Sequence, residues 1–311
     1  MSEQARFGIH TGTQFATWDE IVKMWRRAED LGYDTAWTYD HFTAVMMDPM
    51  TPCLEAWSCL AALAVHTERI RLGAMVTGNT YRHPAVLAKI ATTVDVISNG
   101  RLEFGIGAGW YEPEHAMFGL PFGSVGERAE RLDEALTVIR SLWREQHTTF
   151  EGTHYALSEA VAEPKPVQVP HPPITIAAVG EKRMLPIVAR HADAWTSFGS
   201  PEIFRRRGEL LSEMCEAEGR DAAAIEKAVL LPAVIAEDME PYAFMVQGWA
   251  AYQGVEEAEG KRWMLAGPPD EVCRQVDAYL DAGVGHIILL ITPFNIEALE
   301  RFAEEVMPRY R

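Results

Sequence analysis

The chain has 311 residues, of which 48% are hydrophobic and 23% charged, a balance typical of a globular protein with a sizeable core. Its formal net charge is −17, from 28 Lys and Arg against 45 Asp and Glu. Such an acidic chain without a basic run is not expected to bind nucleic acid or an anionic membrane, although a few local donors would suffice for a small anionic ligand.

The four cysteines form no Cys-x-x-Cys pair, and no histidines stand at the spacing of a zinc site. We therefore expect reduced thiols and no bound metal. No apolar stretch approaches the roughly 18 residues of a membrane span, and the first residues lack the pattern of a secretory signal. The sequence predicts a cytoplasmic protein.

Segments typical of buried strands alternate with helical patterns along the chain. The predicted strands are RFGIHTG, DTAWTYDH, IRLGAMV, LEFGIGAG, ITIAAV, ADAWTSF, VLLPAVIA and HIILLIT. The helical patterns lie at 17–31, 54–66, 84–97, 126–145, 181–191, 201–218, 241–259, 269–282 and 296–309. The first begins with a capping box of Thr17 and Glu20.

Eight strands alternating with helices predict an α/β fold, a (β/α)8 barrel over residues 1–311 as a single domain. A segment at 148–173, which includes a hairpin at FEGTHYAL and the run PKPVQVPHPP, is expected as an insertion between the fourth and fifth strands. A doubly wound sheet is the alternative, although it usually holds fewer strands. In a barrel, the active site lies at the carboxyl ends of the strands.

Asp40 and His41 follow the second strand and are the most specific candidates for a catalytic pair at these strand ends. A histidine titrates near neutral pH, so His41 is a candidate for proton exchange with a substrate. A structural pair that caps the loop is the alternative interpretation.

The segment after the fifth predicted strand is a candidate phosphate site. Small residues there precede a helix expected to open at Glu181, whose free N–H groups and dipole would hold an anion with Lys182 or Arg183. An ordinary strand–helix turn is the alternative.

Trp110, just after a glycine-rich strand end, is the best candidate for stacking on a flat ring. Glu112, Glu114 and His115 follow it and are expected on a solvated loop. The tryptophans within predicted helices and strands are expected to fill the core, namely Trp25, Trp37, Trp143 and Trp195. Motifs for a nucleophile elbow, a P-loop or a Gly-x-Gly-x-x-Gly turn are missing from the sequence.

The chain resembles the luciferase-like flavin and deazaflavin oxidoreductases, a superfamily of (β/α)8 barrels. The resemblance rests on WTYDHF, on GNTYRHPAVLAKIATTVDVISNGRLEFGIGAGWYEPEHAMFGLPF, on PKPVQVPHPPITIAAVGEKRMLPIVARHADAW and on AGPPDEV with DAGVGHIILL. It is most similar to the branch described as coenzyme F420-dependent, whereas members that use FMN share most of these motifs.

The resemblance implies roles by position. His41 falls where some deazaflavin dehydrogenases have a proton acceptor, and Met75-Val76 falls where relatives have a non-proline cis peptide under the ring. Residues expected to contact the ring or its tail are Asp40, Met75, Val76, Thr77, Asn79, Gly107, Ala108, Gly109 and Trp110. Residues expected at the phosphate are Ala178, Val179, Gly180, Glu181 and Lys182.

Two positions depart from the family pattern. Trp110 replaces the carboxylate that sugar-phosphate dehydrogenases of this superfamily place after the fourth strand, so their proton donor is missing. Ala177, Ala178 and Val179 stand where relatives often have glycines, so the phosphate seat is expected to be narrower.

The expected activity is hydride transfer between coenzyme F420 and a small organic substrate at the carboxyl-terminal mouth of the barrel. An FMN-dependent monooxygenase that uses reduced flavin, oxygen and a partner reductase is the first alternative, and a cofactor carrier without turnover is the second. The loop 43–52 and the proline-rich insertion are expected to cover the pocket. The resemblance also implies a homodimer.

Overall fold

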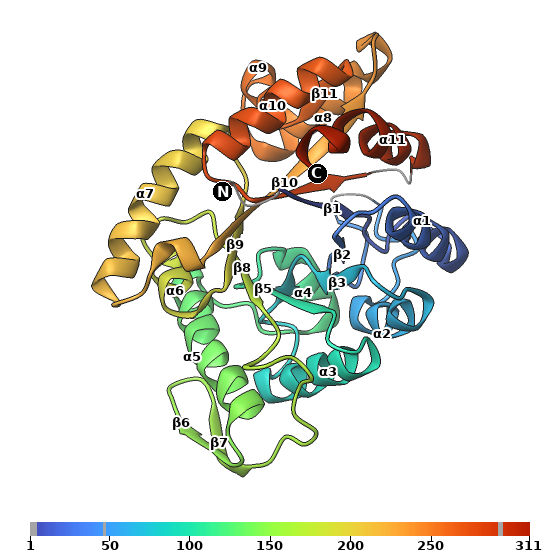
Figure 1. Cartoon of the computed structure of the whole chain (residues 1–311). Coiled ribbons are helices and arrows are strands. Elements are labelled where there is room, and N and C mark those ends of the chain that lie inside the picture. The colour runs from blue at the N-terminus through green and yellow to red at the C-terminus, as the bar shows by residue number, and fades with distance from the viewer. Residues whose placement is uncertain (1–4, 46–47, 292–294) are drawn as a thin grey trace.

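Eight parallel strands form a closed barrel in the computed structural model, which describes residues 5–45, 48–291 and 295–311. The first barrel strand, β1, pairs with both the second and the last, which closes the ring (Figure 1). In order around the barrel the strands are β1 (Arg6–His10), β2 (Thr35–Thr38), β3 (Arg71–Ala74) with its continuation β4 (Thr77–Gly78), β5 (Leu102–Gly107), β8 (Ile174–Ala177), β9 (Ala194–Ser197), β10 (Glu226–Ile235) and β12 (His286–Leu290). The predicted (β/α)8 barrel is confirmed.

Helices surround the barrel on the outside, except α4 (Glu112–Phe118), which lies within the ring of strands in the view of Figure 1. They are α1 (Trp18–Asp30), α2 (Ala56–His66), α3 (Pro84–Ile97), α4 (Glu112–Phe118), α5 (Val125–Arg144), α6 (Met184–His191), α7 (Pro201–Ala217), α8 (Ala243–Gln253), α9 (Glu257–Lys261), α10 (Pro269–Asp281) and α11 (Ile296–Arg301). The capping box of Thr17 and Glu20 at α1 is present as predicted.

Several element boundaries differ from the sequence-based expectation. The pattern at 241–259 is two helices, because Gly254 adopts a left-handed φ of 67° and ends α8. The helix expected at 296–309 continues beyond α11 as a π-helical turn (Phe302–Val306) and a 3-10 turn (Met307–Tyr310). A short strand, β11 (Leu265–Gly267), extends the sheet beside β10 and was not predicted.

The segment between β5 and β8 carries α4, α5 and then the predicted hairpin, formed by β6 (Thr148–Glu151) and β7 (Ala156–Ala160). The hairpin lies outside the barrel (Figure 1). Its proline-rich continuation packs on α3, where the Asp95 carboxylate accepts hydrogen bonds from the Val167 and Gln168 backbones at 2.7 and 3.2 Å. Gln168 reaches Arg71 at the amino-terminal end of β3. The expectation that the proline-rich run covers the active-site mouth is therefore wrong.

Two apolar layers stabilise the barrel. The larger lies between strands and helices and includes Trp25, Trp143 and Trp195, as predicted. A smaller cluster groups Trp37, Met75 and Ile288 with other buried residues of the barrel strands. Trp37 is thus core, and its indole N–H donates to Thr35 Oγ1 at 2.8 Å.

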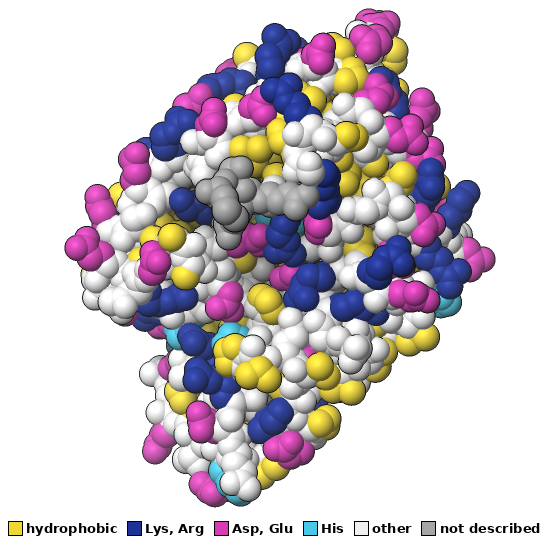
Figure 2. Space-filling model, viewed as in Figure 1, with side chains coloured by type: hydrophobic (Ala, Val, Ile, Leu, Met, Phe, Trp, Pro, Cys, Tyr) yellow, Lys and Arg dark blue, Asp and Glu magenta, His cyan; other side chains and the backbone are white. Residues whose placement is uncertain are grey.

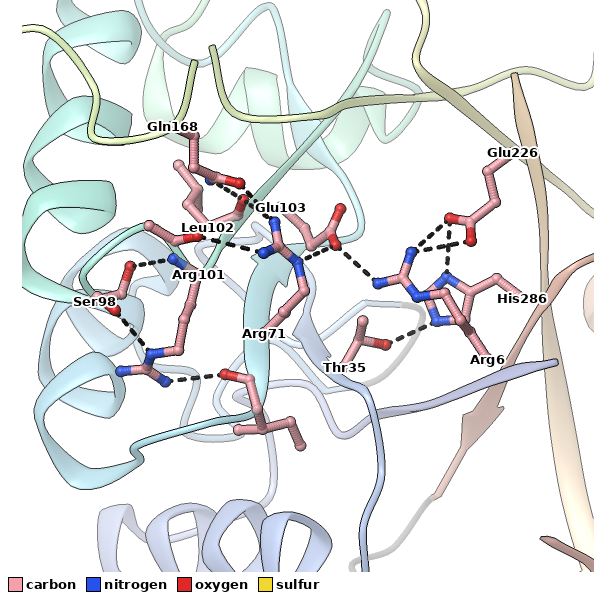
Figure 3. Close-up of polar contacts among 12 residues, drawn as sticks. Arg6, Thr35, Arg71, Ser98, Arg101, Leu102, Glu103, Gln168, Glu226 and His286 are labelled. Carbon is pink, nitrogen blue, oxygen red and sulfur yellow. Dashed lines mark hydrogen bonds and ion pairs between the residues drawn. The ribbon is translucent and has the colours of Figure 1, made fainter. Parts of the chain in front are cut away.

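Charged residues join the amino-terminal ends of the strands (Figure 3). We call Arg6, Arg71, Glu103, Glu226 and His286 the basal network. The guanidinium of Arg6 bridges Glu226, at 2.8 Å, and Glu103, at 2.9 Å, while Arg71 Nε donates to Glu103 at 2.6 Å. Burial raises the pKa of Glu226, but the hydrogen bond from His286 and the charges of His286 and Arg6 outweigh it and hold the pKa at about 2.

Acidic and basic side chains are interspersed over the face shown in Figure 2, with small apolar patches between them. The four cysteines are free thiols. Among the helices formed by the described residues, none combines the length and apolar character needed to cross a membrane.

Candidate active site

The carboxyl ends of β2, β3 and β5 bring together most of the residues predicted to contact a cofactor ring. The Thr77 hydroxyl donates to the Asp40 carboxylate, and the backbone N–H of Asn79 donates to the Gly107 carbonyl at 2.9 Å. A Cβ atom at Gly107 would lie 3.0 Å from Val76 Cγ2. The segment 75–79 therefore packs directly on the end of β5.

The peptide bond between Met75 and Val76 is cis, as the resemblance implied. The bulge at this bond lies against β5 so closely that a Cβ at Gly105 would be 2.0 Å from the Ala74 carbonyl oxygen. His10 Nε2 lies 3.2 Å from the Met75 carbonyl oxygen on the neighbouring side. Close backbone approach thus explains Gly105 of the GIGAG sequence, whereas Gly107 faces the Val76 side chain and Gly109 adopts a left-handed φ of 84°.

His41 forms a buried pair with Glu114, a residue that was expected on a solvated loop. Its Nδ1 lies 2.8 Å from Glu114 Oε2, and the same carboxylate accepts from the Tyr81 hydroxyl and from the Thr43 backbone at 2.9 Å. Burial raises the Glu114 pKa, but the hydrogen bonds from His41 and Tyr81 outweigh it and lower the pKa to about 2. Because an ionised carboxylate only accepts, Nδ1 of His41 carries the proton and Nε2 is free to accept one.

The expectation of a solvated loop at Glu112, Glu114 and His115 is wrong for Glu114 and His115, whereas Glu112 is exposed as expected but lies in a helix. These residues form α4, in which Glu114 is fully buried and His115 is 1% exposed. His115 Nε2 lies 2.7 Å from the Thr80 hydroxyl, so both inward side chains of α4 are bound to the segment after β4. The segment around Glu114 and His115 is short and shows no clear helical periodicity. The sequence therefore did not predict that these two side chains are buried.

Asp40 and His41 do not pair with each other. The Asp40 carboxylate is held by the Arg82 guanidinium, whose Nη2 lies 3.0 Å from Oδ1, and by Thr77. Arg82 is shared with Glu55 at 2.6 Å. Asp40 thus anchors the loop after β4, while His41 binds Glu114 of α4.

Three buried polar atoms near these strand ends have no hydrogen-bond partner among the described residues: His10 Nδ1, Thr38 Oγ1 and Asn79 Oδ1. Burial lowers the pKa of His10 to about 4, so its ring is neutral at pH 7. Since Nε2 faces a carbonyl, Nδ1 is a bare acceptor. Unsatisfied buried acceptors suit a ligand with N–H groups along an edge, as in the pyrimidine portion of a deazaflavin. Within the described ranges, no group of three His, Cys, Asp or Glu suits a metal.

The predicted phosphate segment lies after β8, but its helix starts later than expected. α6 begins at Met184 and not at Glu181, so Gly180, Glu181 and Lys182 form a turn. In the described structure the N–H groups of these three residues have no backbone partner. The Glu181 carboxylate pairs with Arg206 and with Arg207, and Val179 is 51% exposed. The free donors are thus supplied by the turn.

Six aromatic residues lie beside His41 and continue along α8, and we call them the aromatic wall. They are Tyr39, Trp110, Tyr111, Phe198, Trp249 and Tyr252. The ring centroids of His41 and Trp110 are 6.0 Å apart, and those of Trp110 and Tyr252 are 6.4 Å apart. Tyr252 stacks on Trp249 at 5.5 Å. Trp110, 51% exposed, therefore belongs to an extended aromatic surface that only the tertiary structure assembles.

Known proteins resemble this chain over nearly its whole length. An F420-dependent glucose-6-phosphate dehydrogenase from Amycolatopsis mediterranei is 30% identical over 323 residues, which cover 94% of each chain. The coenzyme F420-dependent tetrahydromethanopterin reductase from Methanopyrus kandleri superposes with a TM-score of 0.83 at 22% identity, covering 99% of this chain and 100% of that one.

An F420-dependent secondary alcohol dehydrogenase in complex with an F420-acetone adduct superposes with a TM-score of 0.89 at 21% identity, covering 99% of both chains. At these identities the two structures establish the shared fold. The model of the luciferase-like monooxygenase family matches residues 2–253. The chain therefore belongs to the luciferase-like monooxygenase family.

Proposed function

We propose that the protein is an oxidoreductase that transfers a hydride between coenzyme F420 and a small organic substrate at the carboxyl-terminal mouth of the barrel. The observation that carries the proposal is the His41–Glu114 pair, which engages Nδ1 of His41 and leaves Nε2 as the acceptor, at the same end of the barrel as the Met75–Val76 cis peptide and the unsatisfied acceptors. The relatives named for F420-dependent dehydrogenase activity support the choice of cofactor.

The residues present fit a deazaflavin ring with an anionic tail. Met75, Val76 and Thr77 would support one face of the ring, and Asn79 with Gly107–Trp110 would line its edge. Ala178–Lys182 would hold the phosphate through the free N–H groups of the turn. When bound, the deazaflavin supplies the hydride acceptor or donor, while the protein supplies position and proton transfer.

His41 would exchange the proton that accompanies hydride transfer. Its Nδ1–H donates to Glu114, which fixes the tautomer and leaves the lone pair of Nε2 for a substrate hydroxyl. The Glu114 carboxylate also stabilises the imidazolium that forms when Nε2 takes up the proton. Glu114 is thus a positioning residue. Its charge partly compensates for the carboxylate that sugar-phosphate dehydrogenases of the superfamily have after β5, where this chain has Trp110.

Separate titrations of the pure protein with coenzyme F420 and with FMN, followed by cofactor fluorescence, test the proposal. We expect saturable binding of F420 and weaker binding of FMN. Tight FMN binding without F420 binding would overturn the assignment in favour of an FMN-dependent monooxygenase. Binding of F420 without turnover of any alcohol, aldehyde or enone would favour a carrier.

The proposal includes a homodimer in the cytoplasm. Exposed apolar side chains on α2 and α3 support association, among them Val65 at 74% and Val86 at 54% exposure. Light scattering coupled to gel filtration measures the mass of the particle, and a monomer at micromolar concentration would contradict the dimer.

A further inference from the structure

The wall beside His41 differs chemically from a site for a phosphorylated sugar. We propose, building on the function proposed above, that the substrate is an uncharged, apolar, ring-containing alcohol or the corresponding ketone, held by the aromatic wall with its oxygen at His41 Nε2. Three features of the described residues support this substrate class: the local charge, the aromatic surface and an unpaired buried donor.

The charge around His41 is negative. Asp40, Glu55 and Glu114 are carboxylates, whereas Arg82 is the cation paired with the first two. Three negative charges against one positive charge leave an excess of two negative charges while His41 is neutral. A phosphate dianion bound here would be repelled and would lose its hydration without gaining a cation.

The other cations near the strand ends are occupied or distant. Arg128 donates to the carbonyls of Gly109, at 3.1 Å, and Gly123, at 2.6 Å, and stacks on Phe122. Arg207 is bound to Glu181 and Ser197. Lys182 follows β8, which is separated from β2 by β3 and β5 in the barrel order. These groups suit the proposed cofactor tail better than a substrate at His41.

The surface that continues from His41 is aromatic across three separate elements. Trp110 and Tyr111 follow β5, Trp249 and Tyr252 lie on α8, and Phe198 follows β9 and contacts Trp249 with ring centroids 5.8 Å apart. Flat aromatic faces stabilise an apolar ring by burial and by offset or edge-to-face contact. A polyol would leave most of its hydroxyl groups without partners against this surface.

One polar atom of the wall also lacks a partner. The indole Nε1 of Trp249, a residue 8% exposed, makes no hydrogen bond among the described residues. A buried N–H donor without an acceptor is costly to the free protein and is satisfied when a ligand brings a neutral oxygen or a π-face. This second observation is independent of the aromatic contacts and points to an occupant of the wall.

The reaction balances with the proposed cofactor as the redox partner. The carbinol C–H bond breaks and its electron pair leaves with the hydrogen as hydride to oxidised coenzyme F420. The O–H bond breaks and its proton moves to His41 Nε2, so the C=O bond forms and the alcohol loses two hydrogens. The reverse reaction reduces the ketone with reduced coenzyme F420.

The test compares substrates with the F420-loaded enzyme. We expect turnover of 1-phenylethanol or cyclohexanol, or of acetophenone or cyclohexanone in reverse, with kcat/KM at least about tenfold above that for glucose 6-phosphate. A higher kcat/KM for glucose 6-phosphate would overturn the inference. Failure to bind F420 would instead overturn the proposed function on which the inference rests.

The variant Tyr252→Ala isolates the wall from the proposed cofactor and proton sites. We expect kcat/KM for the apolar alcohol to fall about tenfold, mainly through KM, with F420 affinity unchanged. Tyr242→Ala, outside the wall on the same part of the chain, is the matched control. If no compound is turned over, calorimetric titration of the holoenzyme with acetophenone decides, since lack of binding contradicts the inference.

Discussion

The two ends of the barrel use similar residue types for different purposes. At the amino-terminal end, Arg6, Glu103 and Glu226 satisfy one another, and His286 is bound by Thr35 and Glu226. At the carboxyl-terminal end, His10, Thr38 and Asn79 keep buried atoms without partners, and His41 is bound on one ring nitrogen. Polar groups that satisfy one another contribute to stability, whereas buried groups left unsatisfied cost stability and fit the proposal that a ligand pairs with them.

The contrast extends to histidine. His286 lies at the start of β12, with both ring nitrogens facing protein groups, Thr35 at 2.9 Å and Glu226 at 3.5 Å. His41 lies after β2 and is held by Glu114 through Nδ1. One end of the barrel therefore binds its histidine through both ring nitrogens, and the other binds His41 through Nδ1, which is compatible with the proposed proton exchange at Nε2.

The replacement His41→Ala should have the largest effect, because it removes the proposed proton acceptor. We expect kcat to fall by ~10²–10⁴-fold while the free energy of unfolding changes little. Steady-state turnover and F420 titration are measured on the same sample. Unchanged turnover with a working substrate would show that the proton role is assigned to the wrong residue.

The replacement Glu114→Gln tests whether His41 needs its partner. The amide keeps the shape but loses the charge that fixes Nδ1–H and stabilises the imidazolium, so we expect kcat to fall roughly 10–100-fold. A shift in the pH profile of kcat should accompany the loss. Glu112→Gln, on the same helix and exposed, is the control. A lower free energy of unfolding without a change in the pH profile of kcat would indicate a purely structural role.

The replacement Glu226→Gln tests the basal network at the amino-terminal end of the barrel. We expect the free energy of unfolding to fall by about 2 kcal/mol, because Arg6 and His286 lose a charged partner, with turnover per folded molecule unchanged. Urea denaturation measures the change, and Glu216→Gln, which is exposed, is the control. A loss of turnover as large as that of Glu114→Gln would contradict the division between the two ends.

The comparison of wild type with Glu226→Gln also gives a prediction about the pH dependence of stability. The pKa of Glu226 is lowered from 4.5 to about 2 in the folded state, so its contribution to stability is fully present above pH 4.5 and is lost as the pH falls towards 2. The stability difference between wild type and Glu226→Gln should be constant between about pH 6 and 8 and should shrink below pH 4.5. A difference that grows on acidification would contradict the assigned ionisation.

The replacement Lys182→Ala should have the smallest effect. Lys182 is exposed, so its attraction to an anionic tail is screened by water and salt, and we expect the Kd for F420 to rise only about two- to fivefold. The effect should diminish at high salt. An equal loss with Lys23→Ala, on α1, would show that the change reflects net charge alone.

Most of the barrel is predictable from local sequence. Apolar runs such as HIILL and RLGA identify strands buried on both faces, and the Thr17–Glu20 capping box identifies the start of α1. Boundaries that depend on packing are less predictable. α6 starts at Met184 because the residues before it remain in a turn, and α8 ends where Gly254 adopts a left-handed conformation.

The sequence by itself determined the alternation of strands and helices, the position of the functional end and the family resemblance that placed a cis peptide at Met75–Val76. Only the tertiary structure decided that Glu114 binds His41, that Asp40 forms an ion pair with Arg82, and that α8 lies beside Trp110. The physical reason is the separation in sequence between the residues that interact. Periodicity and capping act between neighbours in sequence, whereas ionisation and aromatic contact depend on residues that the closed barrel brings together from distant strands.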